Sequence, residues 1–140
     1  MKPSSRTEYA LRAMLDLALH RNEAVSNVAD IAQRQHIPAK FLEHILLGMK
    51  AGGLVTSRRG ARGGYVLARE PSAITVGDIV RLSGNSFSSA TQTKGLQDPL
   101  GDIWEDIGDY ARKKLATITL QDVCTRFMEL RQGKASEYAI

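Results

Sequence analysis

The stretch that decides the fold is "IPAKFLEHILLGMKAGGLVTSRRGARGGYVLA", residues 37–68. Its first half predicts a helix, because Pro38 suits a first turn and Gly52–Gly53 suits a helix end. The apolar residues of that half recur at helical spacing on one side: Phe41, Leu42, Ile45, Leu46 and Met49. The second half predicts two short strands, "LVTSR" and "GYVLA", around a tight turn. We therefore expect a helix followed directly by a β-hairpin.

The turn of this hairpin is rich in arginine and glycine. A nucleotide site would need G-x-G-x-x-G before a helix, or G-x-x-x-x-G-K-[ST], whereas this turn reads G-A-R-G-G and precedes a strand. A plain solvated hairpin would use the glycines but would not need the arginines. The wing of a winged-helix protein uses both, because arginine favours a narrow minor groove and glycine lets the backbone approach DNA. In such a wing we expect Arg59 to enter the groove, and Arg58 and Arg62 to contact phosphates.

Three further helices are expected in the first part of the chain, over residues 7–20, 27–35 and 75–83. In the first of them Glu8, Arg12 and Asp16 are spaced by four on a face away from the apolar one, and opposite charges at that spacing stabilise a helix. The second helix has a plausible cap in Asn27, and the third has one in Thr75, with Asp78 three residues on. Two helices separated by a tight turn at residues 34–37 and followed by a hairpin are the order of a winged helix-turn-helix.

The helix over residues 38–51 is the candidate recognition helix. Its side away from the apolar set presents Lys40, Glu43, His44, Leu47 and Lys50. In this motif the N-terminal residues of the recognition helix reach base edges in the major groove. Lys40 can bond a guanine edge or a phosphate, Glu43 can accept from a cytosine amino group, and His44 can donate or accept. The alternative is that these are only solvated helix positions.

A long amphipathic helix is expected after a flexible loop that is rich in Ser, Thr, Gly and Gln. Its apolar stripe comprises Leu100, Ile103, Trp104, Ile107, Ala111, Leu115 and Ile118. The stripe needs a cover, either from its own domain or from the same stripe in a second chain. We expect dimerisation through Ile103, Trp104, Ile107, Ala111 and Leu115. A last helix follows, capped by Thr119, and the tail from Gln132 is expected to fray.

Composition and charge support one basic DNA-binding unit with an attached arm. Residues 1–70 carry 11 Lys/Arg against 6 Asp/Glu, and residues 71–140 carry 8 against 9. Only the first half therefore suits a polyanion. We expect a DNA-binding domain over 1–84, a flexible loop over 85–99, and dimerisation helices with a tail over 100–140. Neither a signal peptide nor a membrane helix is expected, which points to the cytoplasm.

Several runs of the sequence resemble a known family. They are "EYALRAMLDLAL", "ADIAQRQHIPAKFLEHILLGMKAGGLVTSRRGARGGYVLARE", "ITVGDIVRL", and the later Trp104 with "ITLQDV". Over most of the chain they resemble the IscR-type winged-helix transcriptional regulators (the Rrf-two family). The resemblance implies a homodimeric bacterial DNA-binding repressor or activator, paired through the helix around Trp104. It also implies DNA contacts at Lys40, Glu43, His44 and Arg59, although Lys40 and His44 depart from the iron–sulfur members.

The sequence indicates the DNA-binding elements more clearly than the signal that such a protein would sense. Many members of the family hold a two-iron, two-sulfur cluster with three cysteines in the loop before the long helix. Here residues 83–101 contain neither cysteine nor histidine, and clusters are held mainly by thiolates. We therefore expect no cluster, no other metal and no cofactor. Cys124 is either a redox sensor or an inert buried thiol, and a partner enzyme or a small-molecule effector is the remaining source of a signal.

Two other classes of function fit the pattern less well. A winged-helix protein-interaction module would use the hairpin as a docking edge for a partner enzyme. An enzyme would need a nucleophile, a base and an orienting group that converge, and the sequence offers no such set. We therefore expect a mainly α fold with a small β-hairpin wing and a long C-terminal dimerisation helix. Its expected function is a repressor that binds a palindromic promoter site on double-stranded DNA.

Overall fold

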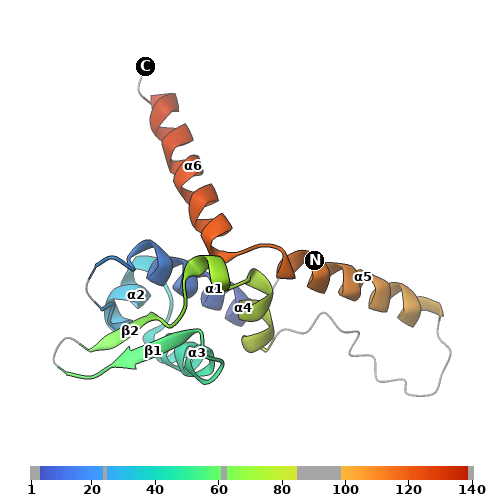
Figure 1. The fold of residues 1–140 in the computed structure, drawn as a ribbon, viewed down its shortest axis with the longest axis horizontal. Helices are drawn as coiled ribbons and strands as arrows, with labels where there is room; N and C mark the ends of the chain where they lie inside the picture. The colour runs from blue at the N-terminus through green and yellow to red at the C-terminus, as the bar shows by residue number, and fades with distance from the viewer. Residues whose placement is uncertain (1–3, 24, 61–62, 85–98, 139–140) are drawn as a thin grey trace.

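A computed structural model describes residues 4–23, 25–60, 63–84 and 99–138 of the chain. Within these residues the fold is helical apart from one two-stranded antiparallel sheet (Figure 1). The elements follow in the order α1 (Ser5–Leu19), α2 (Val28–Gln35), α3 (Ala39–Ala51), β1 (Val55–Arg58), β2 (Gly64–Leu67), η1 (Pro71–Ala73), α4 (Val76–Leu82), α5 (Pro99–Ala116) and α6 (Leu120–Tyr138). The expected class, mainly α with a hairpin wing, is confirmed.

Side-chain caps fix where three of these helices begin. The Asn27 side chain accepts a hydrogen bond from the backbone N–H three residues on, at 2.8 Å. Thr75 and Asp78 exchange two such bonds at the start of α4, which is a capping box. Thr119 and Asp122 do the same before α6, at 2.9 and 3.0 Å. The three caps expected from the sequence are confirmed.

One hydrophobic core is shared by the helices α1, α2, α3 and α4 and by the start of α6. Its largest fully buried side chains are Met14, Ile31, Leu42, Ile45, Leu46, Met49, Leu54, Val55, Ile74, Ile79 and Leu120. Four of them lie on α3 at the helical spacing seen in the sequence, so this helix is held firmly by one face. The other face of α3 is consequently available at the surface.

Phe41 is a correction to the expected core. It was placed on the buried side of α3, yet 40% of it is exposed. It lies in the first turn of α3, at the edge of the buried stripe, where the ring of Tyr9 on α1 covers it edge-on at 5.6 Å. The core therefore covers α3 from Leu42 onward.

Asp16 is a second correction, because it is buried and not on a solvent face. Its side chain is 1% exposed. The Arg34 guanidinium donates to both carboxylate oxygens, at 3.0 and 2.7 Å, and the Gln35 amide donates at 3.0 Å. Burial by itself raises the pKa of Asp16, but these hydrogen bonds and the charge of Arg34 outweigh it, so the pKa lies below its ordinary value. The pair locks α1 to α2, whereas Glu8 and Arg12 form the expected exposed pair at 2.7 Å.

The segment between α5 and α6 is tied back to the body by a short extended pairing. The N–H of Val76 donates to the carbonyl of Ile118, and the N–H of Leu120 donates to the carbonyl of Ile74, both at 2.8 Å. From this point α5 and α6 project away from the body in different directions (Figure 1). Among the residues described, no helix is long and apolar enough to cross a membrane.

The end of the chain differs from the expected frayed tail. Helix α6 continues past Gln132 as far as Tyr138. The added residues include good helix formers and no proline, so the helix has no reason to stop earlier. The first turn of α6 also belongs to the same core as α1, through Leu120 and Cys124. The expected boundaries at 84 and 100 stay predictions.

Candidate nucleic-acid interface

The turn between α2 and α3 sets the orientation of the candidate recognition helix. His36 lies there in the left-handed region, at φ 55° and ψ 46°, a conformation in which histidine is less rare than most residues. The following N–H, of Ile37, donates to the carbonyl of Ala32 at 3.0 Å. Ile37 is buried and anchors the turn in the core. The chain therefore reverses sharply and brings α3 to the surface directly after α2.

The exposed face of α3 contains the three residues expected to read bases. Lys40, Glu43 and His44 are all exposed, opposite the buried stripe of the same helix. Their side chains make no hydrogen bond or ion pair to any residue that the structure describes. They are consequently available to an external partner, and their contact with DNA stays a prediction.

The hairpin is a short, regular wing. β1 and β2 pair antiparallel, from Val55 opposite Leu67 to Arg58 opposite Gly64. The turn uses Gly60 at φ 116°, and the N–H of Gly63 donates to the carbonyl of Gly60 at 2.9 Å. Arg58 and Arg59 are exposed beside this turn. The tip, residues 61–62, lies outside the described residues, so the predicted role of Arg62 has no structural description.

Two contacts hold the wing against the helix-turn-helix, and the sequence signalled neither. The ammonium group of Lys50, near the end of α3, donates to the Ser57 hydroxyl of β1 at 2.7 Å. On the outer edge of β2, the N–H of Tyr65 donates to the carbonyl of Ser26 at 2.9 Å. Lys50 was expected to point to solvent or DNA, but it joins the recognition helix to the wing. α3 and β1 accordingly lie side by side (Figure 1).

Gly64 has a packing role rather than a role in approaching DNA. A Cβ placed on it would overlap the carbonyl group of Ser26 and would lie 2.9 Å from the Cα of Asn27. All of these neighbours are backbone atoms, so no rotamer change relieves the overlap. The glycine is what allows β2 to reach Ser26.

We expect Gly64→Ala to destabilise the fold by about 1–3 kcal/mol, the usual cost of overpacking. The alanine forces β2 away from Ser26 and breaks the bond from Tyr65. Urea denaturation measures the loss. The matched control is Gly133→Ala, because nothing lies within 4 Å of a Cβ at that position of α6; it should leave stability unchanged or slightly raise it. Equal stability of Gly64→Ala and the wild type would contradict this packing.

Comparison with known proteins identifies the family. The model of the Rrf2 family, described as iron-dependent transcriptional regulator, matches residues 3–126. The chain belongs to the Rrf2 family. The regulator CymR of Bacillus subtilis is 34% identical over 125 residues, which are 89% of this chain and 91% of that protein. The regulator IscR of Yersinia enterocolitica is 35% identical over 130 residues, which are 88% of this chain and 79% of that protein.

Solved structures agree with this assignment of the Rrf2 fold. The structure of CymR, the global cysteine regulator of B. subtilis, has a TM-score of 0.78 at 33% identity and covers 90% of this chain and 98% of its own. The structure of T. potens IscR has a TM-score of 0.76 at 34% identity and covers 100% of this chain and 93% of its own. The expected winged-helix fold is confirmed. The chain is a DNA-binding transcriptional regulator and not an enzyme.

The iron named in the Rrf2 description does not fit the donor set of this chain. Cys124 is the single cysteine of the sequence. In the described part of the chain, no three or more His, Cys, Asp or Glu side chains are grouped so that they could hold a metal ion. Thiolates are the usual ligands of iron–sulfur clusters, and one buried thiol cannot supply a set of them.

Cys124 is packed as a core residue of this Rrf2 protein. It is 8% exposed and contacts the cluster that contains Leu120. Burial raises the pKa of its thiol, and the charge of Arg21 offsets this only in part. A raised pKa lowers the thiolate fraction and hence the reactivity. The alternative role of Cys124 as a redox sensor stays an untested prediction.

Proposed function

We propose that this Rrf2 regulator is a cytoplasmic homodimer that represses transcription by occupying a palindromic promoter site. The observation that carries the proposal is the joining of α3 to an arginine-bearing wing by the Lys50–Ser57 bond. This unit presents Lys40, Glu43 and His44 on one element, and Arg58 and Arg59 on the next. A helix and an adjacent basic hairpin suit the major and minor grooves of one DNA segment.

Within this proposal, the two elements do different work. The N-terminal part of α3 enters the major groove, where Lys40, Glu43 and His44 meet base edges. Glu43 also repels phosphates, so it penalises wrong sites. Arg59 enters the minor groove beside it, and Arg58 and Arg62 bind the sugar-phosphate backbone. Binding through several arginines and lysines releases counterions, so the affinity should fall steeply as salt is raised.

We expect Arg59→Ala to weaken binding to the operator by roughly 5- to 100-fold, as for one arginine contact to base edges, and to relax sequence preference. Arg58→Ala should weaken binding to all sequences alike and lower the salt slope by about 1. Fluorescence anisotropy with labelled duplexes at several salt concentrations measures both. Arg81→Ala, in an exposed ion pair on α4, is the control and should bind normally. Normal operator binding by Arg59→Ala would contradict the wing's role.

The dimer is supported by two apolar surfaces that the described part of the chain leaves uncovered. The first is the stripe of α5, where Ile103, Trp104 and Ile107 are 54%, 60% and 39% exposed. The second is a groove of about 460 Å³ between α1 and α6. It is lined by Leu15, Ile118, Val123, Phe127 and Leu130, with Asp122 and Arg126. A second copy of the chain supplies both a stripe and a groove, so a two-fold pairing would cover all four surfaces.

The remaining residues of the expected dimer surface are less exposed. Ala111 and Leu115 are half-buried, because the last turns of α5 approach the start of α4. Gly77 of α4 lies so close to α5 that a Cβ added to it would be 3.3 Å from the backbone of Leu115. This close packing fixes α5 to the DNA-binding part. Two paired chains would therefore hold their two recognition helices at a fixed separation. Two recognition helices at a fixed separation bind two half-sites that lie one helical turn, or a multiple of it, apart.

A further inference from the structure

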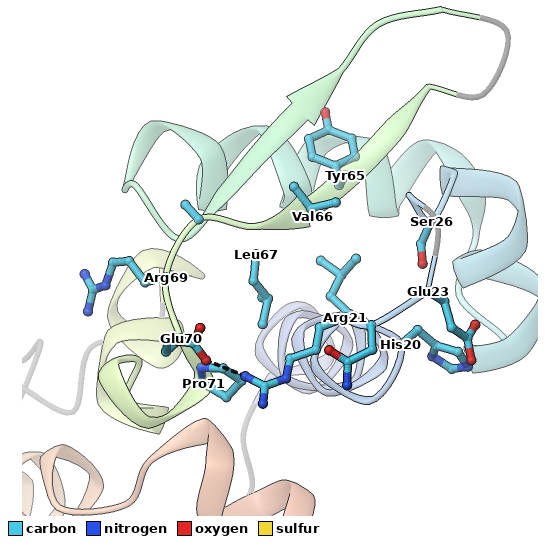
Figure 2. A pocket seen from close by; sticks show the side chains of 13 residues that line it. His20, Arg21, Glu23, Ser26, Tyr65, Val66, Leu67, Arg69, Glu70 and Pro71 are labelled. Atoms are coloured by element: carbon cyan, nitrogen blue, oxygen red, sulfur yellow. Dashed lines mark hydrogen bonds and ion pairs between the residues drawn. The ribbon is translucent and has the colours of Figure 1, made fainter.

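A cavity lies on the outer side of the wing, away from the exposed face of α3 and from the stripe of α5. Its volume is about 470 Å³. One wall is the end of α1 with residues 20–23 and Ser26, and the other is β2 with the segment leading to Pro71 (Figure 2). The size is that of an ordinary small-molecule site.

Charged groups of both signs sit together at one end of this cavity. The guanidinium of Arg21 meets the carboxylate of Glu70 at 2.5 Å, across the two walls (Figure 2). Their side chains are 39% and 75% exposed, and exposed pairs of this kind contribute little to stability. A ligand that offers its own carboxylate to Arg21 and its own cation to Glu70 can therefore replace the pair at little cost.

The rest of the cavity combines free polar groups with apolar surface. The Asn22 amide and the Ser26 hydroxyl line it and make no hydrogen bond to any residue within the described ranges. The apolar part of the lining is mainly the partly buried Leu67, because only 3% of Leu17 is exposed. Arg69, also in the lining, is occupied elsewhere by the Ala73 carbonyl. The two arginines of the lining, Arg21 and Arg69, are balanced by the carboxylates of Glu23 and Glu70, so the cavity has no excess of positive charge, which disfavours a phosphate or another multivalent anion.

We propose that this cavity binds a free α-amino acid with an apolar side chain. Such a ligand carries a carboxylate and an ammonium group on one carbon, which matches the adjacent Arg21 and Glu70. Its side chain would lie mainly on Leu67. This assignment concerns a binding site and does not depend on the proposed function.

An amino acid bound in this cavity would also affect the position of the wing, and this second part of the proposal rests on the proposed function. The wall residue Ser26 holds β2 through the N–H of Tyr65, and β2 leads back to the turn that carries Arg59. A ligand between these walls favours one position of the wing. By linkage, the ligand then changes the affinity for DNA by the same factor by which DNA changes the affinity for the ligand.

The binding site is tested on the full chain without DNA. L-Leucine, L-methionine and L-phenylalanine are titrated at millimolar concentrations and followed by calorimetry and amide NMR spectra. We expect saturable binding of at least one, with shifts at Arg21, Ser26 and Leu67. Isoamylamine and isocaproate, which lack the carboxylate or the ammonium group of leucine, should bind at least about 10-fold more weakly. No binding of the three amino acids, or equal binding of the analogues, would overturn the assignment.

Variants localise the site and separate it from DNA binding. Arg21→Ala and Glu70→Ala should each lower amino-acid affinity at least about 10-fold. The control Arg12→Ala removes a similarly exposed ion pair, with Glu8 in the first half of α1, and should leave the affinity unchanged. Operator affinity is then measured with and without the bound amino acid, and a change of about 5-fold or more is expected. Amino-acid binding with unchanged operator affinity would overturn the effector role alone, and failure of the wild type to bind DNA at all would overturn the proposed function instead.

Discussion

Ile107→Glu is expected to turn the protein into a monomer and to lower its operator affinity by about 100-fold or more. The apolar stripe of α5 is uncovered by its own chain in the described structure, with Ile107 39% exposed beside Trp104 at 60%. A carboxylate in the middle of a paired stripe would be buried without a partner, which is costly. Losing the dimer removes the gain from binding two half-sites at once, which is on the order of 100-fold or more.

Sedimentation and DNA anisotropy on the same sample test this expectation. The matched control is Asp109→Glu, a conservative change on the same helix at an exposed charged residue that already pairs with Arg112. It should remain a dimer with normal affinity. Ile107→Glu should keep its helical circular dichroism, because the side chain is not part of the described core. A dimer that persists in Ile107→Glu would show that the chains pair through another surface.

Asp16→Asn is expected to destabilise the protein by about 2–3 kcal/mol, through loss of charge-assisted hydrogen bonds to a buried carboxylate. Arg34 would keep one acceptor at best, but it is 37% exposed and can turn to water, which limits the loss. The melting temperature should fall by roughly 5–15 °C. Glu8→Gln removes an exposed pair on the same helix and should cost no more than about 1 kcal/mol. Equal stability of the two variants would contradict the locking role of Asp16.

The contribution of Asp16 should depend on pH in a defined direction. Its pKa in the folded protein lies below the ordinary value, so the unfolded chain takes up the proton first. The stabilisation is therefore complete above a pH of about 4, near the unfolded pKa, and is lost as the pH falls through the lower folded pKa. The difference in unfolding free energy between the wild type and Asp16→Asn should shrink over that interval. Urea denaturation at a fixed protein concentration measures it.

The fold was predictable because local signals agree with one another. The cap residues Asn27 and Thr75, the helical spacing of the α3 core and the glycine-rich turn between two short strands all act within a few residues of each other. Such signals do not depend on where distant parts of the chain lie. They were enough for the helix-turn-helix and the wing.

The contacts that fix the site join residues far apart in the sequence, so spacing could not reveal them. Asp16 looks like a solvent-facing charge on α1 until α2 brings Arg34 against it. Gly64 looks like a turn glycine until Ser26 is found beside it. Arg21 and Glu70, 49 residues apart, give no pattern at all. Each depends on packing between elements, which composition and periodicity do not encode.

The most direct test of the central claim is selection of binding sites from random duplex DNA, followed by stoichiometry on the selected site. We expect an enriched inverted repeat with half-sites about one helical turn apart, bound by two chains. We also expect Arg59→Ala to weaken binding to that repeat. Failure to enrich any sequence, or tight binding of one chain to a site without two-fold symmetry, would contradict the proposed homodimeric regulator.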